Sequence, residues 1–245
     1  MRKTQNFLRR AGSAALALTL TVSLCQPAFA ATKAPFSKDE TVYAVMAADG
    51  SVTKTTVSEH LYNADGLAGV EDRSTLKNIV NTESFAEYTQ NGDTLVWNTD
   101  DTDIYYKGET DRQLPISAKV TYTLDGRTAP LSELLGKSGH LVLTIDLTNH
   151  ETGKVSVNGK ERTIVTPLVT AVGVVLGEDA GNVNAVNGLL ESAAKSSVAA
   201  FVTLPGVKDS LDGLLPEQVN GVAEYLQDSV TVEADVERSE ERRVG

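Results

Sequence analysis

The stretch Leu141-Val-Leu-Thr-Ile-Asp-Leu-Thr148 decides the fold class, because a large aliphatic side chain occupies every second position. Successive side chains of a β-strand point to opposite faces, so the pattern predicts a strand with one face in a core. A shift of one residue would expose all four large side chains, which fixes the register. Their burial contributes roughly 6 to 12 kcal/mol before conformational entropy is counted. The side chains predicted to point inward are Leu141, Leu143, Ile145 and Leu147.

Two other segments repeat this period of two, and a third is apolar except at Thr170. Pro115–Leu124 places Ala118, Val120, Tyr122 and Leu124 on one face, and Val230–Val236 places Val230, Val232, Ala234 and Val236 on one face. Both patterns predict half-buried strands. Leu168–Leu176 has no polar face, which predicts a strand buried on both sides.

Glycine turns separate the predicted strands. Pairs such as Asp49-Gly50, Asn91-Gly92 and Asn158-Gly159 lie between β-forming runs and predict hairpins. We therefore expect a mainly β fold: an antiparallel β-sandwich-like domain or domains with a few short helices. The expected strands are Thr41–Ala47, Val52–Val57, Phe85–Tyr88, Thr94–Trp97, Ile104–Tyr106, Val155–Val157, Thr163–Val165, Asn182–Val186 and Val198–Leu204.

The remaining segments are expected to be helical or irregular. Short helices are expected at Pro130–Leu135, Val207–Leu214 and Glu217–Gln227, and residues 58–82 are expected to form a loop with at most one helical turn. Gly188–Lys195 fits either a short helix or a widened hairpin.

The expected domain organisation has five parts. A linker at 31–40 follows an export segment at 1–30, and a β-rich domain at 41–150 precedes a second β-rich half or domain at 151–237. The last eight residues, 238–245, lose the β pattern abruptly. They resemble a peptide that recurs at the ends of truncated chains, so we exclude them from the fold; the alternative is a solvated charged tail.

The first thirty residues have the pattern of a cleaved signal peptide. Four basic residues precede an apolar run at 11–24, and small residues at Ala28 and Ala30 fit signal peptidase, so Ala31 would begin the mature chain. The apolar run is short for a membrane span, although an uncleaved anchor is the alternative. Cys25 follows Leu24, which does not fit a lipoprotein box, and is removed with the signal. We expect an extracytoplasmic protein, secreted or envelope-associated.

The charge of the chain limits its partners. Loss of residues 1–30 removes four basic and no acidic side chains, which changes the net charge from −11 to −15. Nucleic-acid binding depends on Lys and Arg at phosphates, so we expect no nucleic-acid partner. Charge alone also disfavours binding to anionic lipid. Aromatic residues make up only 5% of the chain, which disfavours a wide aromatic platform for sugars.

A series of short motifs resembles the N-terminal extracellular region of uncharacterised Gram-positive envelope proteins that carry Leu-x-x-Gly heptad repeats (phage-infection-protein-like, Pip type). The resemblance covers about residues 38–237 and implies a membrane segment further along the full-length chain, but it implies no reaction. The motifs are Glu40-Thr-Val-Tyr43, Asp93-Thr-Leu-Val-Trp97, Asp103-Ile-Tyr-Tyr-Lys-Gly108, Lys119-Val-Thr-Tyr-Thr-Leu-Asp-Gly126, Gly136-Lys-Ser-Gly-His140, Val186-Asn-Gly188 and Leu204-Pro-Gly206.

The candidate metal ligands are few. His60, His140 and His150 lack the short paired spacing of zinc sites, and His140 and His150 are expected at opposite ends of one strand. The best cation candidates are Asp100, Asp101, Asp103 and Glu109. Counted from Asn98, oxygen-bearing side chains fall at positions 1, 3 and 5 of a calcium loop and Glu109 falls at position 12, but Asp103 stands at position 6, where the sharp turn needs glycine. We therefore expect no metal and no cofactor, and we favour a solvated acidic turn.

The candidate catalytic groups are equally weak. Lys137, Ser138 and His140 lie close in sequence as a possible Ser-Lys or Ser-His pair, but neighbours on a turn rarely share a catalytic geometry. Gly173-Val-Val-Leu-Gly177 lacks the rest of a dinucleotide fingerprint. The only aromatic concentration is Trp97, Tyr105 and Tyr106, and we expect Trp97 in the core.

Three functions are compatible with this sequence. The first hypothesis is a non-enzymatic envelope module that holds partners outside the membrane, as the N-terminal part of a longer protein. The second is a module that binds a glycan or a protein, assisted by calcium at Asp100, Asp101 and Asp103. The third, a secreted hydrolase, ranks last.

Overall fold

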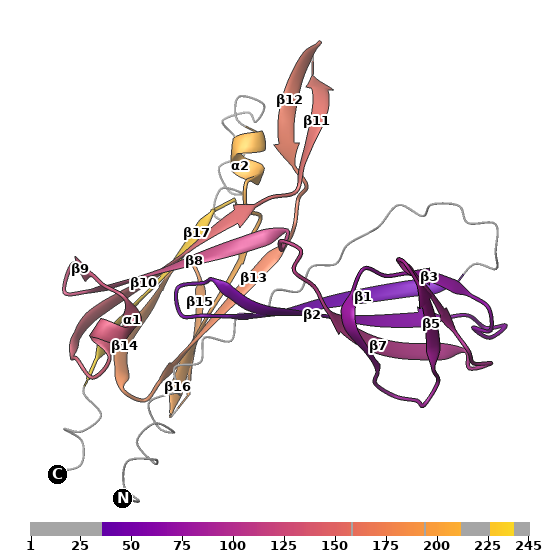
Figure 1. Ribbon diagram of the computed structural model, residues 1–245. Coiled ribbons are helices and arrows are strands. Elements are labelled where there is room, and N and C mark those ends of the chain that lie inside the picture. Colours follow the sequence, from indigo (N-terminus) through magenta and orange to yellow (C-terminus); the bar gives the residue numbers. More distant parts are fainter. Residues whose placement is uncertain (1–35, 158, 194, 212–225, 238–245) are drawn as a thin grey trace, which may run out of the picture. The chain divides into compact units, whose positions relative to one another are not determined.

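The computed structural model describes residues 36–157, 159–193, 195–211 and 226–237 of the 245 (Figure 1). The predicted signal peptide with its cleavage residues Ala28, Ala30 and Ala31 lies outside the described residues. So do the tail 238–245 and most of the predicted helix Glu217–Gln227.

The described chain is mainly β, with antiparallel sheets and two short helices, which confirms the predicted class. The strands are β1 (Ser37–Met46), β2 (Val52–Tyr62), β3 (Glu71–Arg73), β4 (Lys77–Asn81), β5 (Tyr88–Asn91), β6 (Thr94–Trp97), β7 (Asp103–Glu109), β8 (Ile116–Leu124), β9 (Arg127–Thr128), β10 (Gly139–Asn149), β11 (Thr152–Val157), β12 (Lys160–Val165), β13 (Thr170–Gly177), β14 (Ala180–Val186), β15 (Leu189–Ala193), β16 (Ser196–Thr203) and β17 (Ser229–Val236). The helices are α1 (Leu131–Leu134) and α2 (Val207–Ser210).

The chain divides into two compact units. The described part of the N-terminal unit comprises residues 36–45 and 52–113, and that of the C-terminal unit comprises 46–51, 114–157, 159–193, 195–211 and 226–237. We expected a boundary at residue 150 and a linker up to residue 40. The boundary instead follows residue 113, and β1 already begins at Ser37. The position of β17 explains the first difference, because it pairs with β10 across the predicted boundary.

The larger sheet of the C-terminal unit has the strand order β14-β17-β10-β8-β9. Its central strand β10 is antiparallel to both neighbours, with Ile145 opposite Val120 of β8 and Val230 of β17. The predicted inward faces of the three strands are therefore on the same side of one sheet. Most of these side chains are buried, while Leu141, Ala118 and Val236 at the strand ends are partly exposed.

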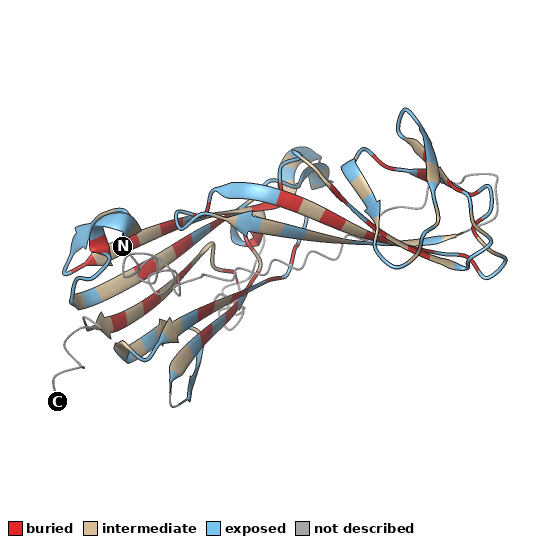
Figure 2. Cartoon of the chain, turned by 60° about the horizontal axis from the view of Figure 1, so that its bottom comes forward, coloured by how far each residue is buried: buried red, intermediate tan, exposed pale blue. Residues whose placement is uncertain are grey.

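A smaller sheet with the order β13-β16-β15 forms the second layer of this unit. It contributes Val172, Val174, Ala199 and Phe201 to the core. Figure 2 shows buried positions that alternate with exposed ones along the strands. The prediction that Leu168–Leu176 is buried on both sides was wrong, because Ala171 and Val175 on its other face are exposed.

Several shorter predictions are also settled. Gly188–Lys195 contains strand β15, which pairs with β16, so the hairpin interpretation is confirmed over the helical one. The helix expected at Pro130–Leu135 is α1. Phe85 is fully exposed and precedes β5, so this strand begins later than predicted.

Among the described residues, we find no helix with the length and hydropathy of a membrane span.

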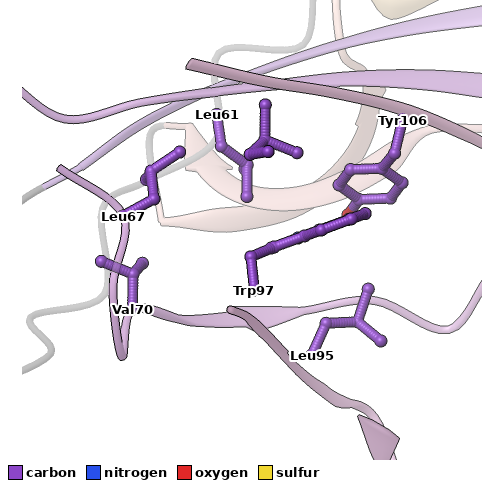
Figure 3. Close-up of a cluster of buried hydrophobic side chains, with 7 residues drawn as sticks. Leu61, Leu67, Val70, Leu95, Trp97 and Tyr106 are labelled. Atoms are coloured by element: carbon purple, nitrogen blue, oxygen red, sulfur yellow. The ribbon is translucent and has the colours of Figure 1, made fainter. Parts of the chain in front are cut away.

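The N-terminal unit contains a sheet with the order β1-β2-β7-β4 and another with the order β3-β6-β5. Their apolar side chains meet in a core that includes Trp97, as predicted (Figure 3). The buried members of this core are Leu61, Leu67, Val70, Leu95, Trp97, Ile104 and Tyr106.

The prediction of a loop at residues 58–82 was wrong. β2 continues to Tyr62, and β3 and β4 follow within this segment. The inward positions of β2 are Thr55, Val57, Glu59 and Leu61, so a carboxylate lies between two buried aliphatic side chains. This buried acid interrupts the hydrophobic alternation from which the strand would have been recognised.

The turn between β1 and β2 belongs to the C-terminal unit. Val120 N–H donates a hydrogen bond to the Asp49 carbonyl oxygen (2.9 Å), and the Tyr122 hydroxyl donates to the Ala48 carbonyl oxygen (2.8 Å). Gly50 in this turn has φ +89°, and a Cβ there would lie 2.3 Å from the Ala118 carbonyl oxygen. Both the backbone angle and the close approach therefore require glycine.

We predict that Gly50→Ala destabilises the C-terminal unit more than Gly126→Ala. Gly126 has φ +79°, but no atom lies within 4 Å of the position that a Cβ would occupy. Its substitution therefore destabilises the fold only because alanine disfavours the left-handed backbone conformation, by about 1–2 kcal/mol. Gly50→Ala adds an overlap with backbone, which costs about 1–3 kcal/mol more. Urea unfolding followed by far-UV circular dichroism measures both. Equal losses would show that the Gly50 contact is not tight.

Candidate functional site

A buried polar cluster of four side chains joins four strands of the N-terminal unit. We define it as Lys38 of β1, Glu59 of β2, Asp72 of β3 and Tyr106 of β7. Lys38 Nζ lies 2.8 Å from Asp72 Oδ1 and 3.3 Å from Glu59 Oε1. The Tyr106 hydroxyl donates to Asp72 Oδ2. Lys38 Nζ also donates to the Arg73 carbonyl oxygen (3.0 Å). The cluster therefore links β1, at the N-terminal end of the described chain, to three other strands.

The two carboxylates of the cluster are almost completely buried. Glu59 is 3% exposed and Asp72 is 1% exposed. Asp72 accepts hydrogen bonds from both Lys38 and Tyr106, so both of its oxygens have partners. Among the described residues, Glu59 Oε2 has no hydrogen-bond partner. A buried oxygen without a partner disfavours the ionised form of the side chain.

One ammonium group faces two carboxylates, and this imbalance affects the protonation of Glu59. Burial raises the pKa of Glu59 to about 7; the charge of Lys38 opposes the rise, and the charges of Glu40 and Asp72 add to it. Burial and the neighbouring Asp72 charge also raise the pKa of Tyr106, so its hydroxyl stays a donor. With Glu59 protonated, Lys38 and Asp72 form a balanced pair. The cluster can therefore bind and release a proton near neutral pH.

The structure does not bring the four candidate cation ligands together. Asp100, Asp101 and Asp103 lie in or beside the turn before β7, whereas Glu109 ends that seven-residue strand, about 20 Å away. The Glu109 carboxylate is paired with Lys54 and accepts a hydrogen bond from Asn78. In the described part of the chain, no group of three or more His, Cys, Asp or Glu side chains is arranged around a metal position.

Each histidine has a polar neighbour. His60 Nε2 lies 2.9 Å from Asp103 Oδ1, and its ring stacks on Tyr105 with centroids 4.1 Å apart. His140 Nδ1 lies 3.0 Å from Asp235 Oδ1, and this hydrogen bond raises the pKa of His140. His150 Nε2 lies 2.8 Å from the Ser117 hydroxyl.

The remaining sequence candidates occupy regular structure. His140 and His150 lie at opposite ends of β10, as predicted. Gly173 and Gly177 belong to β13, a strand rather than a dinucleotide-binding turn. Ser138 directly precedes β10, and the His140 ring beside it is directed to Asp235 of β17.

The second feature of interest is the outer face of the sheet β13-β16-β15, which we call the apolar face. Its rows follow from the register: Val175 lies opposite Val198, Gly173 opposite Ala200, and Ala171 opposite Val202. On β15, Leu189 lies opposite Ala200 and Glu191 opposite Val198, which makes Glu191 the only charged side chain in these rows. The apolar members are Ala171, Gly173, Val175, Leu189, Val198, Ala200 and Val202.

The apolar face is exposed to solvent. Leu189 is 76% exposed, Val175 57% and Val202 53%. The outer face of the larger sheet provides a contrast, because it carries polar side chains such as Thr121, Asp146 and Glu233. One sheet therefore has the polar outer face expected of a half-buried sheet, and the other does not.

A hollow of about 450 Å³ lies among the end of β10, strand β12 and helix α2. Its polar groups are used by the backbone around it. Asp228 Oδ1 accepts a hydrogen bond from Gly206 N–H (2.6 Å), and the Ser210 hydroxyl accepts one from Val165 N–H (2.9 Å). The first bond holds the connection between β16 and α2 and the second joins α2 to β12, so we assign the hollow a structural role.

No protein-family model, curated protein or solved structure matches this chain. Sequence reasoning named neither the buried polar cluster nor the apolar face. A signal for the apolar face was present, because Leu168–Leu176 has apolar residues on both sides of the strand. The indication of the buried polar cluster in the sequence was weaker, because it consists only of the acidic Glu59 between Val57 and Leu61 at alternate positions.

We predict that Glu59→Gln removes a pH dependence from the stability of the N-terminal unit. The folded-state pKa of Glu59, about 7, lies above its ordinary value of 4.5, so the folded state holds a proton that the unfolded chain releases. The contribution to stability is thus complete below about pH 4.5 and is lost as the pH rises through 7, by roughly 3 kcal/mol in total. Glutamine cannot titrate, so the variant should be more stable than the wild type at pH 8 and similar at pH 5.

Urea unfolding followed by the fluorescence of Trp97, the single tryptophan, reports on this unit. Glu83→Gln, at an exposed position, is the matched control and should keep the pH dependence of the wild type. The same pH dependence in Glu59→Gln and the wild type would contradict the assignment.

We predict that calcium does not change the melting temperature. A cation bound by the folded state would raise it, but Glu109 is paired elsewhere and cannot complete a site with Asp100, Asp101 and Asp103. Thermal melting in millimolar calcium and then in EDTA measures the effect. A rise in melting temperature that Asp101→Asn abolishes would restore the calcium hypothesis.

Proposed function

We propose that this chain is a non-enzymatic module that acts outside the cytoplasm and binds a protein partner through the apolar face. The apolar face is the observation that carries the proposal. A contiguous apolar surface on a soluble protein marks a binding site more often than a site of reaction. The face offers aliphatic side chains and one carboxylate, Glu191, which suit association rather than proton transfer.

The energetics favour a partner that covers this face. Each apolar side chain removed from water stabilises a complex by about 25 cal/mol per Å² of area. The strands already hold the aliphatic side chains in fixed rows, so little backbone entropy is lost on binding. A flat array of Val, Ala and Gly also allows the close approach of a second sheet or of an extended segment.

The aromatic residues favour a protein partner over a glycan. Sugar recognition commonly uses exposed aromatic rings, and the only aromatic concentration in the sequence is Trp97, Tyr105 and Tyr106. Trp97 and Tyr106 are buried in the core, and the Tyr105 ring stacks on His60. These rings therefore do not form one exposed platform.

The location is proposed on the basis of the sequence. The basic residues, the apolar run and Ala28 and Ala30 support export with a cleaved signal peptide. The resemblance to the N-terminal extracellular region of Pip-type envelope proteins supports a place in the envelope. The acidic composition supports a partner other than nucleic acid.

We predict that a photo-crosslinker at Val198 captures a partner protein in intact bacteria. Val198 lies on β16, the central strand of the apolar face, so a covering partner comes within reach of the probe. The control is the same probe at Asp146, an exposed position on the outer face of the larger sheet. A discrete adduct at Val198 and none at Asp146 is expected.

The same cells test the location. The mature protein should begin at Ala31 and be digested by protease added outside the membrane. Equal crosslinking at the two positions would remove the apolar face as the binding site. A protein protected from protease, with residues 1–30 intact, would remove the extracytoplasmic location.

A further inference from the structure

Strand β13 lies at an edge of its sheet. The order β13-β16-β15 gives β13 a partner on one side only, and in the described part of the chain no other strand pairs with it. All eight of its residues pair with β16 without a register shift. Its other edge therefore presents a regular row of backbone N–H and C=O groups, with successive groups pointing alternately toward β16 and away from it.

Four other outer strands, β1, β4, β9 and β14, carry features that discourage further pairing, and β13 carries none of these features. Short length, bulges, charged side chains and proline are the usual protections of an edge strand. β4 has five residues, Lys77 and a bulge, and β14 has a bulge between Gly181 and Asn184. β9 has two residues, and β1 begins with three charged side chains at positions 38–40. The sequence of β13, Thr170-Ala-Val-Gly-Val-Val-Leu-Gly177, contains no charge and no proline.

The exposed edge and the apolar face meet along the same strand. Ala171, Gly173 and Val175 belong to the apolar face, and their backbone belongs to the unpaired edge. We infer that β13 receives an extended segment of a partner protein as an added strand, and that the apolar side chains of this segment continue the rows of the apolar face. This inference rests on the proposed function and specifies how the partner binds.

A second copy of the chain fits this edge less well than a different protein. Two copies joined edge to edge would place two apolar faces side by side and leave both exposed. Each copy also carries a net charge of −11, or −15 without residues 1–30, which opposes self-association. The occupant therefore belongs to another polypeptide.

Charge specifies the ends of the added segment. Glu178 and Asp179 follow β13 directly, in the turn that leads to β14. Lys or Arg flanking the added strand would neutralise these acids and the general acidity of the chain. The expected partner segment has apolar residues at alternate positions and basic residues at its ends.

The test uses the full mature chain and a fluorescent peptide of alternating Val and Thr with Lys at both ends. Two further peptides have the same side chains but carry backbone N-methyl groups on one alternate set of residues or on the other. Fluorescence anisotropy measures their affinities. Strand addition predicts that the unmodified peptide binds and that at least one methylated peptide binds roughly tenfold more weakly, because its N–H groups cannot form the ladder.

Protein variants locate the site. Val175→Lys places a charge on the edge strand at an exposed position and should weaken binding of the unmodified peptide roughly tenfold. Thr121→Lys adds the same charge to the outer face of the larger sheet and should leave the affinity unchanged.

Three outcomes would overturn the inference. Absence of binding by the unmodified peptide, or equal binding of all three peptides, would exclude a backbone ladder. A dimer in sedimentation equilibrium that Val175→Lys dissociates would identify a second copy as the occupant. If any of these outcomes is observed, an adduct at Val198 in intact bacteria would still support the proposed function. Absence of that adduct would contradict both the proposed function and the inference of strand addition.

Discussion

The pairing of β10 with both β8 and β17 is the interaction on which the C-terminal unit depends. It places Val120, Ile145 and Val230 in one row, although they are far apart in the sequence. The strict alternation in β10 fixes the register of both ladders, because a slip of one residue would turn its aliphatic side chains to solvent. Once this sheet exists, the smaller sheet has an apolar layer on which to pack. Its own inner residues, Val172, Val174 and Phe201, then complete the core.

This constraint explains which parts of the fold could be predicted. Local signals were sufficient where the apolar pattern and the turn residues agreed, as in β8, β10, β17 and the hairpin around Asn91-Gly92. The domain boundary could not be predicted, because no local pattern shows that β17 returns to β10. The segment 58–82 was misjudged for a different reason, since Glu59 stands where the strand rule expects an apolar residue.

The candidate features lie where the sequence breaks the rule that buried residues are apolar and exposed residues are polar. Glu59 is a buried acid, and it persists because Lys38 approaches it and a raised pKa allows it to be neutral. Val175 and Val202 are exposed apolar residues on a regular sheet. Proteins commonly break this rule at functional sites, where an unfavourable local arrangement serves another purpose. The acidic turn at Asp100 and Asp101 obeys the rule as an ordinary solvated turn, which agrees with its failure to recruit Glu109.

The wrong prediction that Leu168–Leu176 is buried on both sides also indicates that the apolar face has a function. Its composition is that of a strand covered on both sides, yet in the isolated chain one side faces solvent. A partner that covers Ala171, Val175 and their neighbours on β16 would give the strand the environment that its residues indicate. An uncharged edge next to this face would be a liability for a free monomer, because it invites nonspecific pairing. The proposed partner would cover both features at once, and the residues of β13 would then have the covered environment that their composition indicates.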